Sequence, residues 1–346
     1  MKFKKLGNTD LNVSLICLGT MTWGEQNTQA DAFEQMDYSV DQGVNFFDTA
    51  ELYAVPPKAE TYTKTEIMIG NWFAEKHNRE KIILATKISG HGCSWIRGGG
   101  MQYAEENITK AIEGSLTRLK TDYIDLYQLH WPERNTNFFS KLGYKHKEDE
   151  EEWNSFESIL KTLNKFVDQG KIRHIGLSNE TPYGFAKFLN ISEKCNLPRV
   201  VSVQNPYSLV NRTYEVGMAE ISIRDKAGLL AYSPLGFGVL SGKYLNNQMP
   251  EGSRLKLFGE HFPRYQGSRT SQAVEEYYKV AKKYDLSLTQ MSLAFVNQQE
   301  FVTSNIIGAT TMNQLKENVT SINIKLEEDV MSEINKIHHL NPNPAP

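Results

Sequence analysis

The chain has 346 residues, of which 40% are hydrophobic and 23% charged, enough for one large core or two modest ones. Its net charge of −3 at pH 7 and isoelectric point of about 6.3 exclude a strong basic field, so we expect neither nucleic acid nor a membrane surface as a partner. Its three cysteines, Cys17, Cys93 and Cys195, show no metal-ligand spacing, which is typical of a reduced cytoplasmic protein. No apolar run approaches the roughly 20 residues of a membrane span, and the basic amino terminus does not resemble a signal peptide.

Short apolar runs rich in β-branched residues alternate with longer amphipathic segments along the chain. In the segment Asn107–Thr121, apolar side chains recur at spacings of three and four residues, as on one face of a helix. Strands and helices in alternation indicate a parallel sheet with helices outside it. The runs that we predict to be strands are Ile16–Gly19, Val44–Asp48, Ile82–Lys87, Ile124–His130, Ile172–Ser178, Val200–Gln204, Leu229–Ser233 and Ser304–Gly308.

Eight such units favour a closed barrel, so the predicted fold is α/β, a (β/α)8 TIM barrel forming a single domain over residues 1–346. A doubly wound sheet competes, but it needs a G-x-G-x-x-G fingerprint after its first strand, and none occurs there. Phe3–Leu6 and Val13–Leu15 are expected to form a hairpin that caps the bottom of the barrel. Residues from about 337 to 346 are expected to form a tail, whose proline-rich end, Asn341–Pro346, is either loose or an extended cover.

Two connections are unusually long, Trp131–Trp153 and Gly236 to about Arg269. Both follow a predicted strand, so both lie on the carboxyl-end face, where barrels build their active sites. The charged run Lys145–Glu152 is expected to be a solvated segment without chemistry. Gly98–Gly100 is expected to be a flexible turn, because no lysine and hydroxyl follow it as in a phosphate-binding loop.

Three predicted strands end in a polar side chain, Asp48, Lys87 or His130, and Tyr53 follows Asp48 by five residues. Considered one at a time, each residue has a purely structural interpretation. Asp48 would cap a turn, Tyr53 would pack at the rim, Lys87 would be a solvated charge at the barrel mouth, and His130 would lie under a loop. In a barrel, however, the ends of successive strands converge at the mouth. The joint placement of these four residues favours a catalytic site for proton transfer.

A hydride added to a carbonyl carbon leaves negative charge on oxygen, which must be stabilised and protonated. Tyrosine has a reference pKa of about 10, and we expect the Lys87 ammonium to lower the pKa of Tyr53. Asp48 would keep Lys87 charged and oriented, and His130 would donate a hydrogen bond to the carbonyl oxygen. General acid catalysis of this type contributes about two to four powers of ten in rate.

The same residues resemble a known family. Asp48 and Tyr53 in FDTAELY, Lys87 in ATK and His130 in DLYQLH match the catalytic tetrad of the aldo-keto reductases. The resemblance covers nearly the whole chain and includes ICLGT, GKIRHIGLSN, QN and YSPL in the family's order. Through TMTWGEQN, HWP and QNPYSL the chain is most similar to the bacterial Tas-type NADP(H)-dependent reductases. This implies an oxidoreductase that reduces a small aldehyde or ketone to an alcohol with NADPH, with Tyr53 as the general acid.

The resemblance also implies that NADPH binds extended across the barrel mouth without a Rossmann fold. Three polar side chains at strand ends would hold the carboxamide, and Tyr232 would stack on the nicotinamide ring. Glycines after the seventh strand would allow close approach of the pyrophosphate, under a lid carrying Lys243 and Arg254; for Arg254 a solvated basic loop is an equal alternative. The implied cofactor-binding residues are Thr20, Met21, Ser178, Asn179, Gln204, Tyr232, Ser233, Leu235, Gly236, Gly238, Lys243, Arg254, Gly308, Thr310, Gln314 and Asn318.

The segment from Gly308 to Asn318 opens a predicted helix, whose free N–H groups favour an anion, and the family places the adenosine 2′-phosphate there. Better-studied members have a Lys and an Arg around this phosphate, where this chain has Ala309 and Gln314. Fewer charged contacts weaken the discrimination between NADPH and NADH. Because some relatives with Gln still bind NADPH, NADPH remains the expected cofactor.

Aromatic residues in the strand-end loops predict a pocket for an apolar or aromatic carbonyl compound, although exposed tryptophans can equally mark a contact surface. The candidates for the pocket wall are Met21, Trp23, Trp95, Trp131 and Phe237. Because the barrel closes its own sheet, a monomer is the simplest expectation.

Two other functions compete with carbonyl reduction. Some relatives with this barrel are regulatory subunits of ion channels that sense redox state through a bound nicotinamide cofactor, but they differ at the position of His130. A metal-dependent hydrolase would need clustered His and carboxylate ligands at the strand ends, where only His130 and Asp48 qualify, so no metal is expected.

Overall fold

The computed structural model describes residues 1–346 and shows eight parallel strands closed into a barrel. Each strand pairs with the next one in sequence, and the last strand closes the ring against the first. The barrel strands are β3 (Ile16–Gly19), β4 (Phe46–Asp48), β5 (Ile83–Ile88), β6 (Ile124–Leu129), β7 (Ile172–Ser178), β8 (Val200–Pro206), β9 (Gly228–Tyr232) and β10 (Val302–Ile307). All eight predicted runs overlap a strand, with ends that differ by up to two residues, and the (β/α)8 barrel is confirmed.

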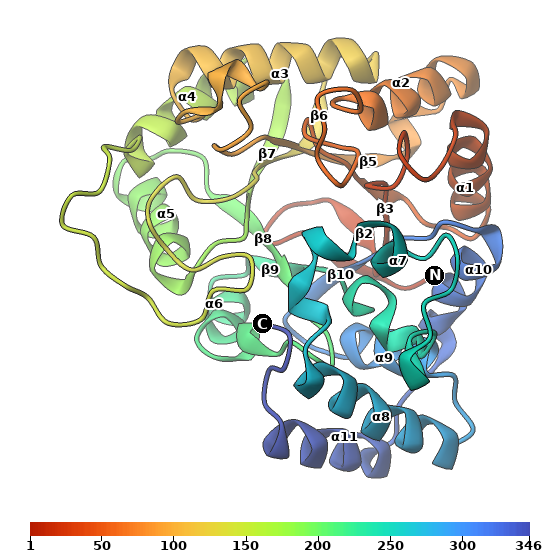
Figure 1. Ribbon diagram of the computed structural model, residues 1–346. Helices are drawn as coiled ribbons and strands as arrows, with labels where there is room; N and C mark the ends of the chain where they lie inside the picture. The colour runs from red at the N-terminus through yellow and green to blue at the C-terminus, as the bar shows by residue number, and fades with distance from the viewer.

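Helices form an outer ring around these strands (Figure 1). The segment predicted as a helix over 107–121 is helical over Glu105–Leu119 and buries its apolar face. None of the helices is both long and apolar enough to cross a membrane. The helices are α1 (Gln29–Asp41), α2 (Lys64–Lys76), α3 (Glu105–Leu119), α4 (Phe156–Asp168), α5 (Pro182–Lys194), α6 (Met218–Arg224), α7 (Arg254–Phe258), α8 (Ser268–Lys283), α9 (Leu288–Asn297), α10 (Met312–Thr320) and α11 (Glu328–Leu340).

Local sequence signals fix where several of these helices begin. Thr28 and Asp31 exchange side-chain and backbone hydrogen bonds in a capping box at the start of α1. The hydroxyl of Ser155 accepts a hydrogen bond of 3.1 Å from the N–H of Ser158 and begins α4. Pro182 occupies the first turn of α5, where its missing N–H costs nothing. These caps set the lengths of the loops that surround the barrel mouth.

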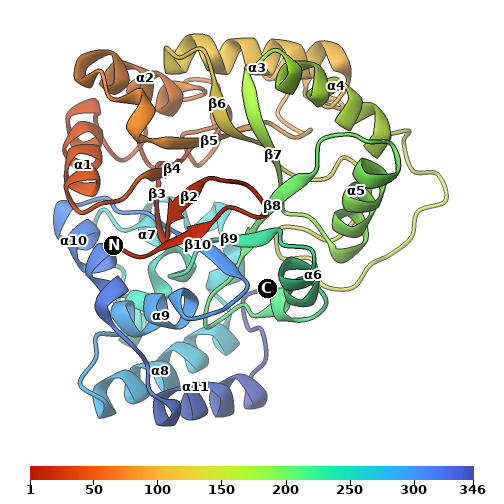
Figure 2. The ribbon, with the colours of Figure 1, turned by 180° about the vertical axis from the view of Figure 1, so that it is seen from behind.

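The amino-terminal hairpin, β1 (Phe3–Lys5) with β2 (Asn12–Ser14), closes one end of the barrel. Leu6 and Val13 are fully buried and pack against side chains that point into the barrel. Seen from behind, the hairpin lies across that end of the strands (Figure 2). The predicted cap is therefore confirmed. The barrel side chains beneath it are Cys17, Phe46, Ala85, Leu126, Val201, Leu230 and Ile306.

The tail is shorter than predicted, because α11 continues through residues 337–340. Its end is an extended cover and is held in place. Ala345 is fully buried and donates its N–H to the carbonyl of Val210 at 3.0 Å. Asn343 accepts a hydrogen bond of 2.6 Å from the N–H of Arg212.

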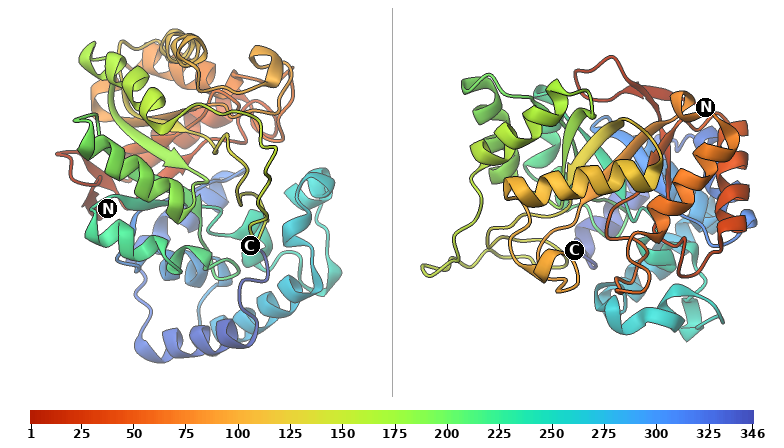
Figure 3. Two further views of the ribbon diagram at one scale, coloured as in Figure 1. Left: turned by 90° about the vertical axis from the view of Figure 1, so that its left-hand side faces the viewer. Right: turned by 90° about the horizontal axis from the view of Figure 1, so that it is seen from above.

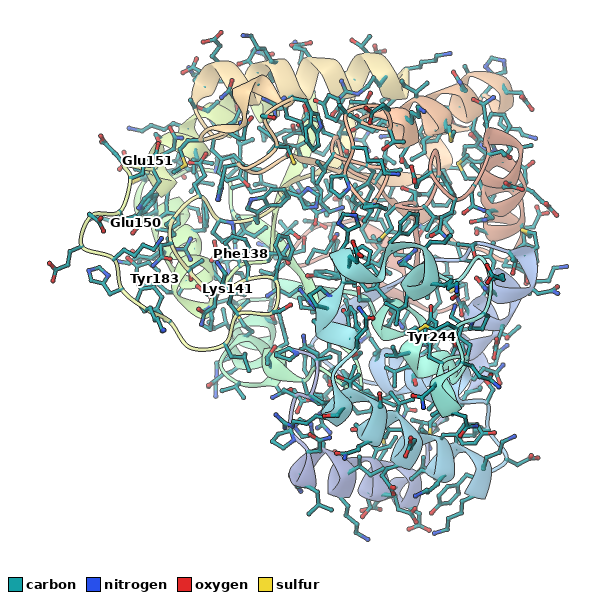
Figure 4. The ribbon with its side chains drawn as sticks, in the orientation of Figure 1. Phe138, Lys141, Glu150, Glu151, Tyr183 and Tyr244 are labelled. Carbon is teal, nitrogen blue, oxygen red and sulfur yellow. The ribbon has the colours of Figure 1, made fainter.

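The two long connections, between β6 and α4 and between β9 and α8, project from the side opposite the hairpin (Figure 3). The second contains α7 and several short helical turns. In the first, residues 145–149 are exposed, as predicted for the charged run. Figure 4 shows Glu150 and Glu151 at its outer edge. Glu150 is only half-exposed, because its carboxylate accepts a hydrogen bond from the N–H of Asn135.

Candidate active site

A cleft of about 1500 Å³ lies at the carboxyl end of the barrel. Gly19, Asp48, Ser178, Gln204 and Tyr232 line it from the ends of five strands, and the two long connections form its sides. Ligand pockets for drug-sized molecules typically measure about 300–1,000 Å³. This cleft therefore has room for a ligand larger than one small molecule.

Three of the predicted catalytic side chains form a continuous chain at the cleft floor. Nζ of Lys87 donates to Oδ2 of Asp48 at 2.7 Å, to the carbonyl oxygen of Thr49 at 2.8 Å and to the hydroxyl of Tyr53 at 3.4 Å. The Lys87 side chain is 0% exposed and that of Asp48 is 3% exposed. A buried ion pair of this kind is tolerated because both charges are hydrogen-bonded. It leaves the ammonium within reach of the phenol of Tyr53, which lines the cleft.

Burial and charge oppose each other at these groups. Burial acts to lower the pKa of Lys87, but the Asp48 carboxylate and Tyr53 raise it, and the pKa ends above its ordinary value. Burial raises the pKa of Tyr53, and the Lys87 ammonium lowers it only in part. The expected direction of the lysine's influence is confirmed, but the expected net lowering of the Tyr53 pKa is wrong. The phenolate loses more by leaving water than it gains from one neighbouring ammonium.

His130 lies beside Tyr53, with ring centroids 5.9 Å apart in an edge-on arrangement. Burial, and secondarily the Lys87 ammonium, hold the pKa of His130 well below its ordinary value. The ring is therefore neutral near pH 7. Its Nδ1 is buried without a partner in the protein. Both features leave the imidazole able to form a hydrogen bond with a ligand in the cleft.

The residues predicted to hold the nicotinamide lie together on one wall. Nε2 of Gln204 donates to Oδ1 of Asp48 at 2.8 Å, and no protein donor reaches Oε1 of Gln204. The hydroxyl of Tyr232 donates to Oδ1 of Asn179 at 2.6 Å. Ser178 donates to the carbonyl of Gln204 at 2.9 Å. These bonds fix the side chains before any ligand binds and leave the Gln204 carbonyl free to accept from an amide.

Lys243 and Arg254 are basic groups of the cleft wall with no carboxylate near them. Burial, and then the charge of Arg254, lower the pKa of Lys243. Burial lowers the pKa of Arg254 to about 10. Gly238 has φ +99°, a conformation that favours glycine, and a Cβ atom there would lie 2.8 Å from Cε of Lys243 and displace the end of that side chain. Two unpaired, partly buried cations beside a glycine turn fit a bound pyrophosphate, whose negative charge would offset the cost of burying them.

At the start of α10 the polar groups are uncharged. Oε1 of Gln314 accepts from the N–H of Thr310 at 3.0 Å and from its hydroxyl at 3.1 Å. Asn318 donates to the carbonyl of Gly308 at 3.1 Å. All four residues line the cleft, on the predicted adenosine side. The amide NH2 of Gln314 is left to face a phosphate, without a cation beside it.

The aldo/keto reductase family model matches residues 15–339, nearly the whole chain. The chain belongs to the aldo/keto reductase family. The protein tas of Escherichia coli K12 is 48% identical over 348 residues, covering 100% of both chains. An aldo-keto reductase of Babesia bovis is 37% identical over 75% of this chain and 96% of its own. The uncharacterised oxidoreductase YrpG of Bacillus subtilis is 32% identical over 97% of this chain and 96% of its own. The similarity to tas agrees with the Tas-type resemblance of the sequence motifs.

Membership of this family makes the chain an oxidoreductase that acts on small carbonyl compounds. The structure places most of the expected cofactor residues on the cleft wall. The exception is Gly236, at φ +52°, which shapes the turn without lining the cleft. The expected residues that do line it are Thr20, Met21, Ser178, Asn179, Gln204, Tyr232, Ser233, Leu235, Gly238, Lys243, Arg254, Gly308, Thr310, Gln314 and Asn318.

Two of the predicted pocket tryptophans lie elsewhere. Trp23 is fully buried, and its Nε1 donates to Oε1 of Gln35 on α1 at 3.1 Å, so it belongs to the packing between barrel and helix. Trp95 is 42% exposed and does not line the cleft. Trp131 and Phe237 do line it, as predicted. An aromatic residue near a strand end can turn inward or outward, and spacing alone does not decide between the two.

Several groups around the cleft were not anticipated from the sequence. Gln128 is fully buried in β6 and donates to Oδ1 of Asp48 at 3.2 Å. Ser140 and Arg264, from the two long connections, meet through a hydrogen bond of 2.9 Å on the cleft wall. Gln128 was detectable as an amide inside an apolar strand, whereas the loop residues carry no periodic signal. No group of three or more His, Cys, Asp or Glu side chains that could hold a metal ion is present.

Proposed function

We propose that the protein reduces an aldehyde or ketone to an alcohol with NADPH, and that Tyr53 is the general acid. The observation that supports this most is the hydrogen-bonded chain from Asp48 through Lys87 to Tyr53 at the floor of the cleft. In this chain the Asp48–Lys87 ion pair is hydrogen-bonded to one phenol, that of Tyr53. His130 lies next to that phenol, where it can bind the same carbonyl oxygen.

The electrostatics favour Tyr53 over His130 as the proton donor. The depressed pKa of His130 leaves it neutral, so it holds no acidic proton at neutral pH. Its ring N–H donates a hydrogen bond that stabilises the developing charge on the carbonyl oxygen. The hydroxyl of Tyr53 then gives its proton to that oxygen. Lys87 stabilises the resulting phenolate, and Asp48 keeps the ammonium charged and in place.

The nicotinamide cofactor supplies the hydride when bound, and the chain's own residues orient it. The free Oε1 of Gln204, with Ser178 and Asn179, suits a carboxamide. The unpaired Lys243 and Arg254 suit the pyrophosphate. Together they would hold the nicotinamide in the cleft that Tyr53 also lines.

The test compares the wild type with Tyr53→Phe, following the loss of NADPH absorbance with an activated aromatic aldehyde. The phenol makes no hydrogen bond other than that from Lys87, so its removal leaves the cleft intact. We expect turnover to fall by about 10²–10⁴-fold with the Kd for NADPH unchanged. Equal turnover in both proteins would exclude Tyr53 as the acid. Tight NADPH binding without wild-type turnover would support a regulatory subunit instead.

A further inference from the structure

Arg264 is a third basic group on the cleft wall, and nothing in the protein neutralises it. It lies on the short helical turn Pro263–Tyr265 of the long connection after β9 and is half-buried. Burial acts to lower the pKa of Arg264, but the phenols of Tyr265 and Tyr232 raise it, and the pKa ends above its ordinary value, so the guanidinium is charged. Its Nε donates to the hydroxyl of Ser140 at 2.9 Å. A partly buried guanidinium without a carboxylate is available to an anionic ligand.

The position of Arg264 places it near the reacting groups. Burial raises the pKa of Tyr232, while Arg264 lowers it and Tyr53 raises it further, so both groups lie close to the Tyr232 phenol. A chain of aromatic contacts leads from the Arg264 side back to the catalytic residues. Phe139, which adjoins Ser140, packs on Trp131 at 5.6 Å, and Trp131 packs on His130 at 4.9 Å.

Arg264 is separate from the two cations that suit the pyrophosphate. Lys243 and Arg254 act on each other, and Arg254 lies over the ring of Phe237 at 4.8 Å. Arg264 lies instead over the ring of Tyr265 at 5.5 Å and is hydrogen-bonded to Ser140 of the other long connection. The remaining cofactor phosphate belongs to the uncharged groups around Gln314. Arg264 is thus a positive charge that the proposed cofactor contacts do not use.

We propose that Arg264 binds a carboxylate of the substrate, so that the preferred substrates are carbonyl compounds that also carry a carboxylate. This inference rests on the proposed function and names its substrate class. The guanidinium offers paired donors that match a carboxylate, and the hydroxyl of Ser140 adds a further donor once released from Nε. Trp131 and Phe139, whose rings are 5.6 Å apart, line the same cleft and offer an apolar surface to the rest of such a substrate.

The experiment compares 4-carboxybenzaldehyde with its methyl ester, which keeps the ring and the aldehyde but removes the charge. The wild type, Arg264→Gln and Arg264→Lys are assayed with saturating NADPH. Arg224→Gln, on the exposed face of α6, is the matched control for loss of one positive charge. We expect the wild type to prefer the carboxylate in kcat/KM by about tenfold or more, the size of a charge-assisted hydrogen bond. The preference disappears in Arg264→Gln, partly returns in Arg264→Lys and persists in Arg224→Gln.

A binding measurement keeps this proposal distinct from the proposed function. Calorimetry of 4-(hydroxymethyl)benzoate and its methyl ester on the NADP⁺-loaded protein detects the carboxylate site whether or not either aldehyde is reduced. A carboxylate preference that Arg264→Gln abolishes supports the site even if turnover fails. No preference in the wild type, or an equal loss for acid and ester, overturns it. A higher Kd for NADPH in Arg264→Gln, with the carboxylate preference retained, also overturns the proposal and assigns Arg264 to the cofactor.

Discussion

Gln204 and Asp48 are joined by a hydrogen bond of 2.8 Å from Nε2 of the amide to Oδ1 of the carboxylate. The other carboxylate oxygen accepts from Lys87 at 2.7 Å. Gln128 completes the arrangement, because its Nε2 donates to Asp48 Oδ1 at 3.2 Å and its Oε1 accepts from Gln204 at 3.3 Å. One buried carboxylate therefore orients both the amide that faces the cofactor space and the ammonium behind Tyr53.

This relationship predicts that Gln128 positions Gln204. Replacing Gln128 by Leu keeps the volume but removes one of the two hydrogen bonds that orient the Gln204 amide, so that the Asp48 bond alone holds it toward the carboxamide. We expect the Kd for NADPH to rise about tenfold and the free energy of unfolding to fall by about 1–3 kcal/mol, the cost of the lost hydrogen bonds. Fluorescence titration with NADPH and denaturant unfolding measure the two effects.

Ser202→Ala is the matched control, because Ser202 is a buried polar residue of β8, the strand that carries Gln204, and its hydroxyl has no partner. It is expected to leave the Kd unchanged. If Gln128→Leu lost stability but bound NADPH as the wild type does, Gln128 would be a structural residue only.

The buried, neutral His130 predicts a stability that falls in acid. Because its folded-state pKa is well below the unfolded value of about 6.5, the unfolded chain binds more protons than the folded one as the pH drops below about 6.5. The contribution of His130 to unfolding free energy therefore decreases by up to about 1.4 kcal/mol per pH unit in that window. His130→Asn removes this contribution, so its unfolding free energy should change less between about pH 7 and pH 5.

Urea unfolding at several pH values measures this slope. His174 and His338, whose pKa values burial also lowers, remain in both proteins and contribute equally. His146→Asn, at an exposed residue of the long β6–α4 connection, is the control and should retain the wild-type slope. Equal slopes in His130→Asn and the wild type would show that His130 is not held neutral.

The barrel could be predicted from the sequence because each strand is a short apolar run followed by a helical period. Asp48 and Lys87 could be placed because they end such runs, and strand ends meet at the barrel mouth. The sign of the net pKa shift at Tyr53 could not, because it depends on how much burial the surrounding loops impose. The prediction that Trp23 lines the pocket is wrong, because the local backbone conformation of the loop directs its indole toward α1 and not toward the cleft.

The unanticipated Ser140 and Arg264 lie 124 residues apart, in connections that follow different strands. Neither connection has a hydrophobic period that would orient its side chains. Their meeting depends on how two irregular loops pack over one cleft. Such contacts require the three-dimensional structure.

The uncharged start of α10 predicts that a cation there increases selectivity for NADPH. Gln314→Arg places a guanidinium beside the amide and hydroxyl groups of this wall, where the lining carboxylate of Glu317 already accepts a hydrogen bond from Ser287. We expect the Kd for NADPH to fall about tenfold, by a charge-assisted contact with the 2′-phosphate, and the Kd for NADH to stay the same. Titrations with both cofactors measure the ratio.

Asn313→Arg adds the same charge to the same helix at an exposed residue outside the cleft lining. It should leave the ratio of the two Kd values unchanged. A similar gain for NADPH in both variants would indicate a general electrostatic attraction, and no gain in either would place the 2′-phosphate elsewhere.

Gly90, just after β5, predicts a packing constraint on the substrate wall. A Cβ atom there would lie 2.2 Å from Nε1 and Cε2 of Trp131, which lines the cleft. Gly90→Ala must therefore displace the indole. We expect the KM for an aromatic aldehyde to rise about tenfold and the free energy of unfolding to fall by about 1–3 kcal/mol, as for an overpacked core. The Kd for NADPH should not change, because Trp131 lies on the substrate side.

Gly100→Ala, where a Cβ atom would meet nothing within 4 Å, is the control and should behave as the wild type. A raised NADPH Kd in Gly90→Ala would mean that Trp131 borders the cofactor, whereas an unchanged KM would remove Trp131 from the substrate wall.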